Sequence, residues 1–111
     1  MSRIVVLGGA ESGVGAAVLA KVKGFDVFLS DYGKISEHFA DELRKWDISF
    51  EEGRHTEDLI LNADEVIKSP GIPGTAPIIK KIEAKGIHII SEIEFAGRYD
   101  TAKKICITGS N

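Results

Sequence analysis

The clearest chemical signal in the chain is a run of small residues after the apolar segment 4–7: Gly8-Gly9-Ala10-Glu11-Ser12-Gly13-Val14-Gly15. Its glycines permit a sharp turn, and free amides at the start of a following helix attract phosphate. The strict dinucleotide pattern G-x-G-x-x-G would place glycine at position 10, where Ala10 stands. Ser12 could cap the helix or bind a phosphate, and the Glu11 carboxylate would have to turn outward. The run favours a phosphate-binding turn; the alternative is a tight connection without a ligand.

A second candidate is the acidic residue Asp31, which follows the apolar run 27–29. A carboxylate about 20 residues after a glycine turn binds the ribose in dinucleotide folds, and it can also accept an N–H from a base. Tyr32 could stack on that base. The alternative is a turn residue before Gly33, followed by an exposed tyrosine without a role. The spacing favours a binding role for Asp31.

Two further loops follow apolar runs. Ser69-Pro70-Gly71-Ile72-Pro73-Gly74 is stiff enough for its backbone to lie against a ligand, or it is only a rigid connector. The strand-like run 105–107 leads into Thr108-Gly109-Ser110-Asn111, which resembles the opening of a second phosphate loop. The lysine and hydroxyl residue that would bind ATP and magnesium do not follow in this sequence. We therefore expect a boundary drawn inside a larger protein.

Short apolar runs rich in isoleucine and valine must position these loops. Strands are expected at Ile4–Leu7, Val27–Leu29, Ile48–Phe50, Val66–Ile67, Ile87–Ile90 and Ile105–Ile107. Between them, helical spacing predicts apolar stripes of Val14, Val18 and Val22, of Phe39, Leu43 and Trp46, and of Ile78, Ile79 and Ile82. Helix ends are marked by Gly24 and Gly86, a first turn by Pro77, and a capping box by Ser91 and Glu94.

Alternation of strands and helices predicts parallel β-α-β units with right-handed crossovers. The expected fold class is α/β, a Rossmann-like doubly wound and mostly parallel sheet of about five strands with helices on both faces. In such a sheet, ligands bind beyond the carboxyl ends of the strands. All the candidate loops named above follow strands, so they belong to that edge.

Composition limits the possible classes. The 111 residues, 43% of them hydrophobic, suffice for one domain, and no run approaches the roughly 20 apolar residues of a membrane span. No secretory leader is visible, so a cytoplasmic location is expected. The net charge of −3 makes nucleic acid an improbable partner. Cys106 is expected to be packed core, and the scattered His38, His55 and His88 are expected to be surface or cap residues rather than zinc ligands.

Taken together, these segments resemble the amino-terminal domain of the Mur ligases, ATP-dependent cytoplasmic enzymes that add amino acids to the peptidoglycan precursor. The resemblance covers essentially the whole chain. It is carried by Ile4–Gly8, Ser12–Gly15, Ser30-Asp31, Lys68–Ile72, Ser91–Glu94 and Ile107–Asn111. Within the family, the Ser-Pro-Gly loop, the Ile-Glu segment and the closing Thr-Gly-Ser-Asn are most similar to the ligases that add D-glutamate.

The resemblance implies a UDP-substrate-binding domain over residues 1–103 and, over 104–111, the start of an ATP-binding middle domain cut before its phosphate-loop lysine. The substrate would be UDP-N-acetylmuramoyl-L-alanine. The implied contacts are Ala10, Glu11, Ser12 and Gly13 with the diphosphate, Asp31 and Tyr32 with uracil, Ser69 to Gly71 with the sugar side, and Gly109, Ser110 and Asn111 with ATP.

In the whole enzyme, the resemblance implies ATP and Mg²⁺ as cofactors, an acyl-phosphate intermediate, and D-glutamate as the attacking amine. The chain alone should have no activity. Other Mur ligase subtypes stay open as an alternative. From other classes, an NAD(H)-binding sensor or redox domain and a pure interaction module also stay open.

Overall fold

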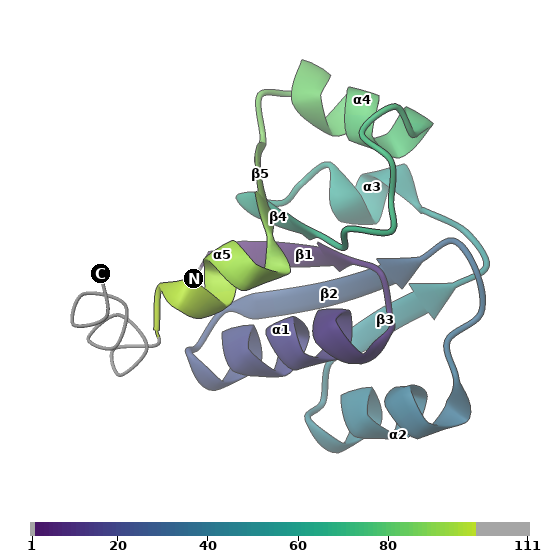
Figure 1. Cartoon of the computed structure of the whole chain (residues 1–111), viewed down its shortest axis with the longest axis vertical. Helices are drawn as coiled ribbons and strands as arrows, with labels where there is room; N and C mark the ends of the chain where they lie inside the picture. The colour runs from purple at the N-terminus through teal and green to yellow at the C-terminus, as the bar shows by residue number, and fades with distance from the viewer. Residues whose placement is uncertain (1, 100–111) are drawn as a thin grey trace, which may run out of the picture.

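Five parallel strands form one sheet, and a helix follows each of them in the computed structural model, which describes residues 2–99 (Figure 1). The strand order is β3-β2-β1-β4-β5. The elements are β1 (Arg3–Leu7), α1 (Glu11–Val22), β2 (Asp26–Asp31), α2 (Glu37–Lys45), β3 (Ser49–Glu52), α3 (Glu57–Ile60), β4 (Glu65–Lys68), α4 (Pro77–Ala84), β5 (His88–Ser91) and α5 (Glu92–Gly97). The predicted doubly wound α/β class is confirmed.

The central strand β1 is the point at which the order of strands reverses. Val5 pairs with Phe28 of β2 on one side and with Val66 of β4 on the other. The chain first moves outward from β1 through β2 to β3 and then returns to β4 and β5. Such a reversal opens a crevice at the carboxyl ends of the two inner strands. Here it lies between the glycine turn after β1 and the loop 69–74 after β4.

Each face of the sheet has its own apolar core. Ile4 and Val6 pack with α1, α2 and α5, whereas Val5 and Leu7 pack with α3 and α4. Figure 1 shows α3 and α4 on one side of the sheet and α1 and α2 on the other. Because β1 is buried on both faces, it needs an uninterrupted apolar sequence, which the run 4–7 supplies.

The packed face of α1 differs from the predicted stripe. Val14 is buried and Val18 is partly buried, but Val22 in the last turn is 58% exposed. Small residues form most of the buried face instead: Gly13, Ala16, Ala17 and Ala20. Small side chains let the helix axis approach the sheet closely. The face of α1 that carries these small residues is therefore buried, rather than the face marked by the valine spacing.

The predicted stripe of α2 is also only partly right. Leu43 is fully buried and Phe39 partly so, but Trp46 follows the end of the helix and is 37% exposed. Its indole nitrogen donates to Glu42 Oε2 at 3.0 Å. Ala40 supplies the second buried position of the helix.

The predicted helix ends are confirmed. Gly24 and Gly86 have φ of +93° and +76°, the left-handed conformation expected after a helix. Pro77 is the first residue of α4. Ser91 Oγ accepts the Glu94 amide at 3.0 Å, which is half of the predicted capping box.

The strands start and end within two residues of their predicted positions, while the short helix α3 was not predicted. No helix in the part of the chain from 2 to 99 has the length and apolar character that a bilayer crossing demands. The expected strand 105–107, Cys106, the domain start at 104 and the candidate ATP contacts Gly109, Ser110 and Asn111 lie outside the described residues.

Candidate functional site

The turn after β1 requires glycine at its first position for two reasons. Gly8 has φ of +114°, which side-chain-bearing residues rarely adopt. A Cβ atom there would also lie 2.7 Å from the Cβ of Ser69 in the loop after β4. The Gly8 amide donates to the carbonyl of Ser30 at 2.9 Å. The turn is therefore in close contact with the loop after β4 and hydrogen-bonded to the end of β2.

Two more glycines allow helix α1 to start close beneath this turn. A Cβ atom on Gly13 would lie 2.0 Å from the carbonyl oxygen of Gly8, and one on Gly9 would lie 2.8 Å from Ile35 Cγ1. Gly13 is in the first turn of α1, so its missing side chain sets the distance between helix and turn. This explains why glycine is needed at 8, 9 and 13 but not at position 10.

The first amides of α1 are available to an anion. Ala10 occupies the N-cap position without a side-chain cap, and Val14 makes the first intrahelical bond, to the Ala10 carbonyl. Within residues 2–99, the amides of Glu11, Ser12 and Gly13 have no hydrogen-bond acceptor. Ser12 lies inside the helix, so its predicted alternative role as a cap is wrong. Unpaired amides and the positive end of a 12-residue helix can hold a phosphate group.

Asp31 links the turn to the loop after β2. Its Oδ2 accepts the Gly9 amide and its Oδ1 accepts the Gly33 amide, both at 2.8 Å. The bond to Gly33 is the turn role predicted as the alternative for Asp31. Each carboxylate oxygen can accept a further bond. Asp31 can therefore position the glycine turn and still contact a ligand.

The loop after β4 is fixed by backbone and side-chain hydrogen bonds. The Ser69 amide donates to the Leu7 carbonyl at 3.0 Å, and the Ile72 amide donates to the Ser69 carbonyl at 3.1 Å. Lys68 Nζ donates to the Ile72 carbonyl at 2.6 Å. The backbone of residues 69–72 is thus braced by both strands that flank the crevice.

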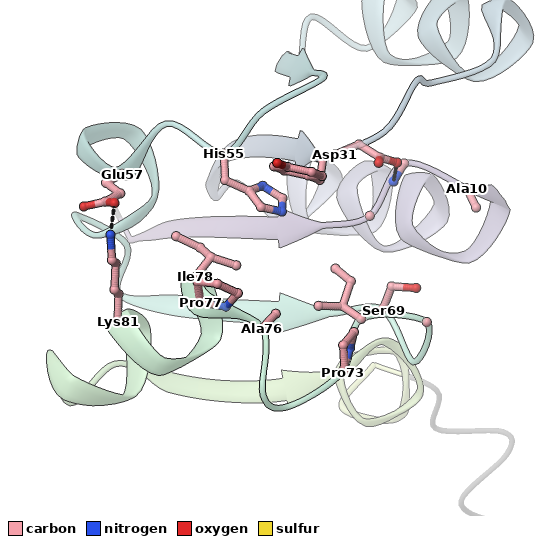
Figure 2. Close-up of a pocket in the computed structure, with 15 residues that line it drawn as sticks. Ala10, Asp31, His55, Glu57, Ser69, Pro73, Ala76, Pro77, Ile78 and Lys81 are labelled. Carbon is pink, nitrogen blue, oxygen red and sulfur yellow. Dashed lines mark hydrogen bonds and ion pairs between the residues drawn. The ribbon is translucent and has the colours of Figure 1, made fainter.

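A cavity of about 680 Å³ opens between these loops and the start of α4 (Figure 2), within the usual size range of small-molecule sites. Its lining residues are Gly8, Gly9, Ala10, Asp31, Tyr32, His55, Glu57, Ser69, Gly71, Ile72, Pro73, Ala76, Pro77, Ile78 and Lys81. The structure therefore brings five predicted site residues together: Ala10, Asp31, Tyr32, Ser69 and Gly71. Glu11, Ser12 and Gly13 lie at the adjoining start of α1, outside this lining.

One wall of the cavity was not predicted as part of a site. Pro77 and Ile78, at the start of α4, face it with apolar atoms, and Figure 2 shows them opposite His55. Lys81 of α4 forms an ion pair with Glu57 of α3 at one end (Figure 2). Helical spacing predicts Ile78 only as part of a core stripe, because spacing does not tell which buried residues border a cavity.

His55 is predicted as a surface or cap residue, and in the structure it is half-buried and lines this cavity. Its half-buried ring has Nδ1 at 2.7 Å from Ser30 Oγ. The ring centroid lies 5.6 Å from that of Tyr32, with the planes tilted by 41°. Ser30 precedes His55 by 25 residues, so no local motif marks the pair.

The Glu51 carboxylate binds the other side of the Ser30 hydroxyl. Its Oε2 accepts from Ser30 Oγ at 2.8 Å and from the Thr56 amide at 2.7 Å. Burial alone would raise the pKa of Glu51, but hydrogen bonds from Thr56, Ser30 and Arg54 outweigh burial and lower it. Glu51 is therefore ionised at neutral pH.

Burial lowers the pKa of His55, and this effect outweighs the nearby negative charges of Glu51 and Asp31, which raise it. The imidazole is therefore neutral at neutral pH. A neutral imidazole has one donor nitrogen and one acceptor nitrogen.

The strand order, the glycine turn at the start of α1 and the cavity at the reversal point define a Rossmann-like α/β domain. Comparison with known proteins narrows this class. The family model described as the MurD N-terminal domain matches residues 3–78, and the chain belongs to this family.

Curated relatives agree with this family. The chain is 66% identical over 111 residues to the UDP-N-acetylmuramoylalanine–D-glutamate ligase of Bacteroides thetaiotaomicron, covering 100% of the chain and 25% of the relative. It is 65% identical over 108 residues to the ligase of the same name from Porphyromonas gingivalis, covering 97% of the chain and 24% of the relative. The chain thus spans about a quarter of the length of the curated relatives it matches.

Solved structures show the same architecture. UDP-N-acetylmuramate-alanine ligase from Thermotoga maritima matches with a TM-score of 0.75 and 26% identity, over 94% of this chain and 23% of that one. A murein peptide ligase from Psychrobacter arcticus matches with a TM-score of 0.79 over 88% of this chain and 20% of that one. At 22% identity, the second match shows the fold alone.

Proposed function

We propose that this chain binds the UDP end of UDP-N-acetylmuramoyl-L-alanine in a ligase that adds D-glutamate to that precursor. One observation carries the proposal: a cavity at the reversal point of the sheet that adjoins the uncapped amides of α1. The substrate in this proposal is taken from the name of the relatives, UDP-N-acetylmuramoylalanine–D-glutamate ligase, about a quarter of whose length matches this chain. In this proposal, this domain binds the UDP end of the precursor, whereas the choice of D-glutamate depends on the rest of the protein.

The proposed pose follows the shape of the cavity. The diphosphate lies at the amides of Ala10, Glu11, Ser12 and Gly13, where the helix offers unpaired donors and a positive dipole end. Uracil lies beside Asp31 and Tyr32, and the sugar side lies toward Ser69 to Gly71. Glu11 is exposed, so its carboxylate can point away from the diphosphate into water.

In this proposal, residues 2–99 bind and orient the substrate and take no part in bond making. ATP would phosphorylate the substrate carboxylate, and the amine of D-glutamate would then displace phosphate to form the amide. ATP and Mg²⁺ would be held by the part of the protein that begins at residue 104, with Gly109, Ser110 and Asn111 first. The proposed location of the whole enzyme is the cytoplasm.

Titration of the ¹⁵N-labelled chain tests the proposal. We expect UDP to shift the amide resonances of Glu11, Ser12, Gly13 and Tyr32 in a saturable way at millimolar concentration, with NADH much weaker. Stronger binding of NADH would favour the dinucleotide-sensor alternative. Unchanged resonances with every nucleotide would overturn the site and leave an interaction module.

A further inference from the structure

A buried hydroxyl next to the cavity fixes where the protons of its neighbours must be. Ser30 is 0% exposed, and its Oγ lies 2.8 Å from Glu51 Oε2, 3.2 Å from the Arg54 carbonyl and 2.7 Å from His55 Nδ1. The carboxylate and the carbonyl can only accept, so both compete for the single hydroxyl proton. The contact with His55 therefore needs a proton from the imidazole.

The network assigns the Nδ1–H tautomer to His55. With the proton on Nδ1, the ring donates to Ser30 Oγ while Ser30 donates to the ionised Glu51. Nε2 of the neutral ring is then an acceptor. Among residues 2–99 no group lies within hydrogen-bond distance of Nε2, and the ring lines the cavity (Figure 2).

The surroundings of this acceptor suit a flat heterocycle. Tyr32 packs against the His55 ring on one side, and Figure 2 shows Pro77 and Ile78 across the cavity. The other charged groups that line the cavity are Asp31, engaged by two amides, and the Glu57–Lys81 ion pair. None of these charges pairs with the imidazole.

We propose that His55 is a specificity-determining residue for the base: its Nε2 accepts the imide N3–H of uracil. The inference rests on the proposed function, because it assumes that uridine occupies the cavity. Uracil presents a donor at N3, whereas cytosine presents a lone pair there, which would face the lone pair of Nε2. The Ser30–Glu51 pair acts as a positioning element that keeps the acceptor directed at the base.

The test compares UDP with N3-methyl-UDP, which lacks only the imide proton and carries a methyl group in its place. Kd is measured by calorimetry for the 111-residue chain and for H55N. Asparagine offers an amide donor to Ser30 Oγ but has no atom at the Nε2 position. In the wild type we expect N3-methyl-UDP to bind at least about 10-fold more weakly than UDP. In H55N the two Kd values should agree within about twofold, with UDP weakened about 5- to 10-fold.

A difference in Kd between the two ligands that persists in H55N would overturn the inference. Equal Kd values in the wild type would also overturn it. In both cases the proposed binding of UDP would stand. A wild-type chain that binds no UDP would remove the proposed function and the inference with it.

Discussion

At the scale of single residues, the site depends on glycines that allow close backbone contacts and on a carboxylate that joins two loops. Gly8, Gly9 and Gly13 let the backbone of the turn, helix α1 and the neighbouring loops meet at distances that a Cβ would prevent. Asp31 then ties the turn to the next loop through two amide hydrogen bonds. The unpaired first amides of α1 are therefore held in place by the protein's own contacts.

Gly13→Ala tests this close approach, with Gly15→Ala as its control. The new methyl group would lie 2.0 Å from the Gly8 carbonyl oxygen, so the variant should lose about 2–4 kcal/mol of unfolding free energy. Gly15 is exposed in the same helix with nothing within 4 Å, so Gly15→Ala should gain about 0.5–1 kcal/mol. Urea unfolding measures both. Equal effects of the two variants would show that the contact at Gly13 is not restrictive.

The pKa values of His55 and Glu51 predict that acid destabilises the protein in two stages. Both pKa values are lowered by folding, so the unfolded chain binds more protons and stability falls as pH falls. The contribution of His55 is complete above the ordinary histidine pKa of about 6.5 and is lost below it. That of Glu51 is complete above about 4.3 and is lost at lower pH.

Unfolding free energies of the wild type and of H55N between pH 8 and pH 4 measure the first stage. The wild type should lose stability relative to H55N as pH falls below the ordinary histidine pKa, and Glu51→Gln should reduce the later loss. His38 and His88 are present in both proteins, so the difference isolates His55. Parallel profiles of wild type and H55N would contradict the lowered pKa.

At the scale of elements, α5 is the one helix within residues 2–99 whose start has a side-chain cap, and α1 is the uncapped helix that begins at the glycine turn. The start of α5 is capped by Ser91, whereas the start of α1 has no side-chain cap. An uncapped start beside a cavity leaves its donors for a ligand.

Ser91→Ala should cost about 1 kcal/mol, because the Glu94 amide loses its acceptor. Ser36 occupies the N-cap position of α2 without a side-chain bond, so Ser36→Ala should change stability by less than about 0.5 kcal/mol. Thermal unfolding of the two variants against the wild type checks the difference. A loss at Ser36 as large as that at Ser91 would show that the observed cap bond carries no stability.

Whether a feature depends on neighbouring residues or on contacts between elements decides whether it could be predicted from the sequence. Apolar runs such as 4–7, and the breaks after them, depend on local chemistry, so the strands and the glycine turn were predictable. The buried face of α1 depends on how closely the sheet approaches it, which made Val22 a wrong prediction and Ala17 an unnoticed core residue. The position of His55 on the cavity was missed for a related reason: its loop is held by Ser30 of β2, a contact that only the fold creates.

At the scale of the whole molecule, the sheet joins two cores that share no buried residue. Ile82 lies in the core on the α4 side of the sheet, and Leu43 lies in the core on the α2 side. Both side chains are fully buried in the folded chain. Because β1 contributes alternate residues to each core, loss of either core should remove the support of the strand that serves both. The cavity lies at the end of this shared strand, so its geometry depends on both layers.

Ile82→Ala tests this cooperativity, because Trp46 reports on the opposite face from its position after α2. Ile82 is 0% exposed, and its truncation should cost about 2–5 kcal/mol. If the layers unfold as one unit, the urea midpoint seen by Trp46 fluorescence moves to the same lower value as that seen by far-ultraviolet circular dichroism. Val22→Ala, at a 58% exposed position, should leave both midpoints nearly unchanged. A fluorescence midpoint that stays at the wild-type value in Ile82→Ala would show that the two cores unfold independently.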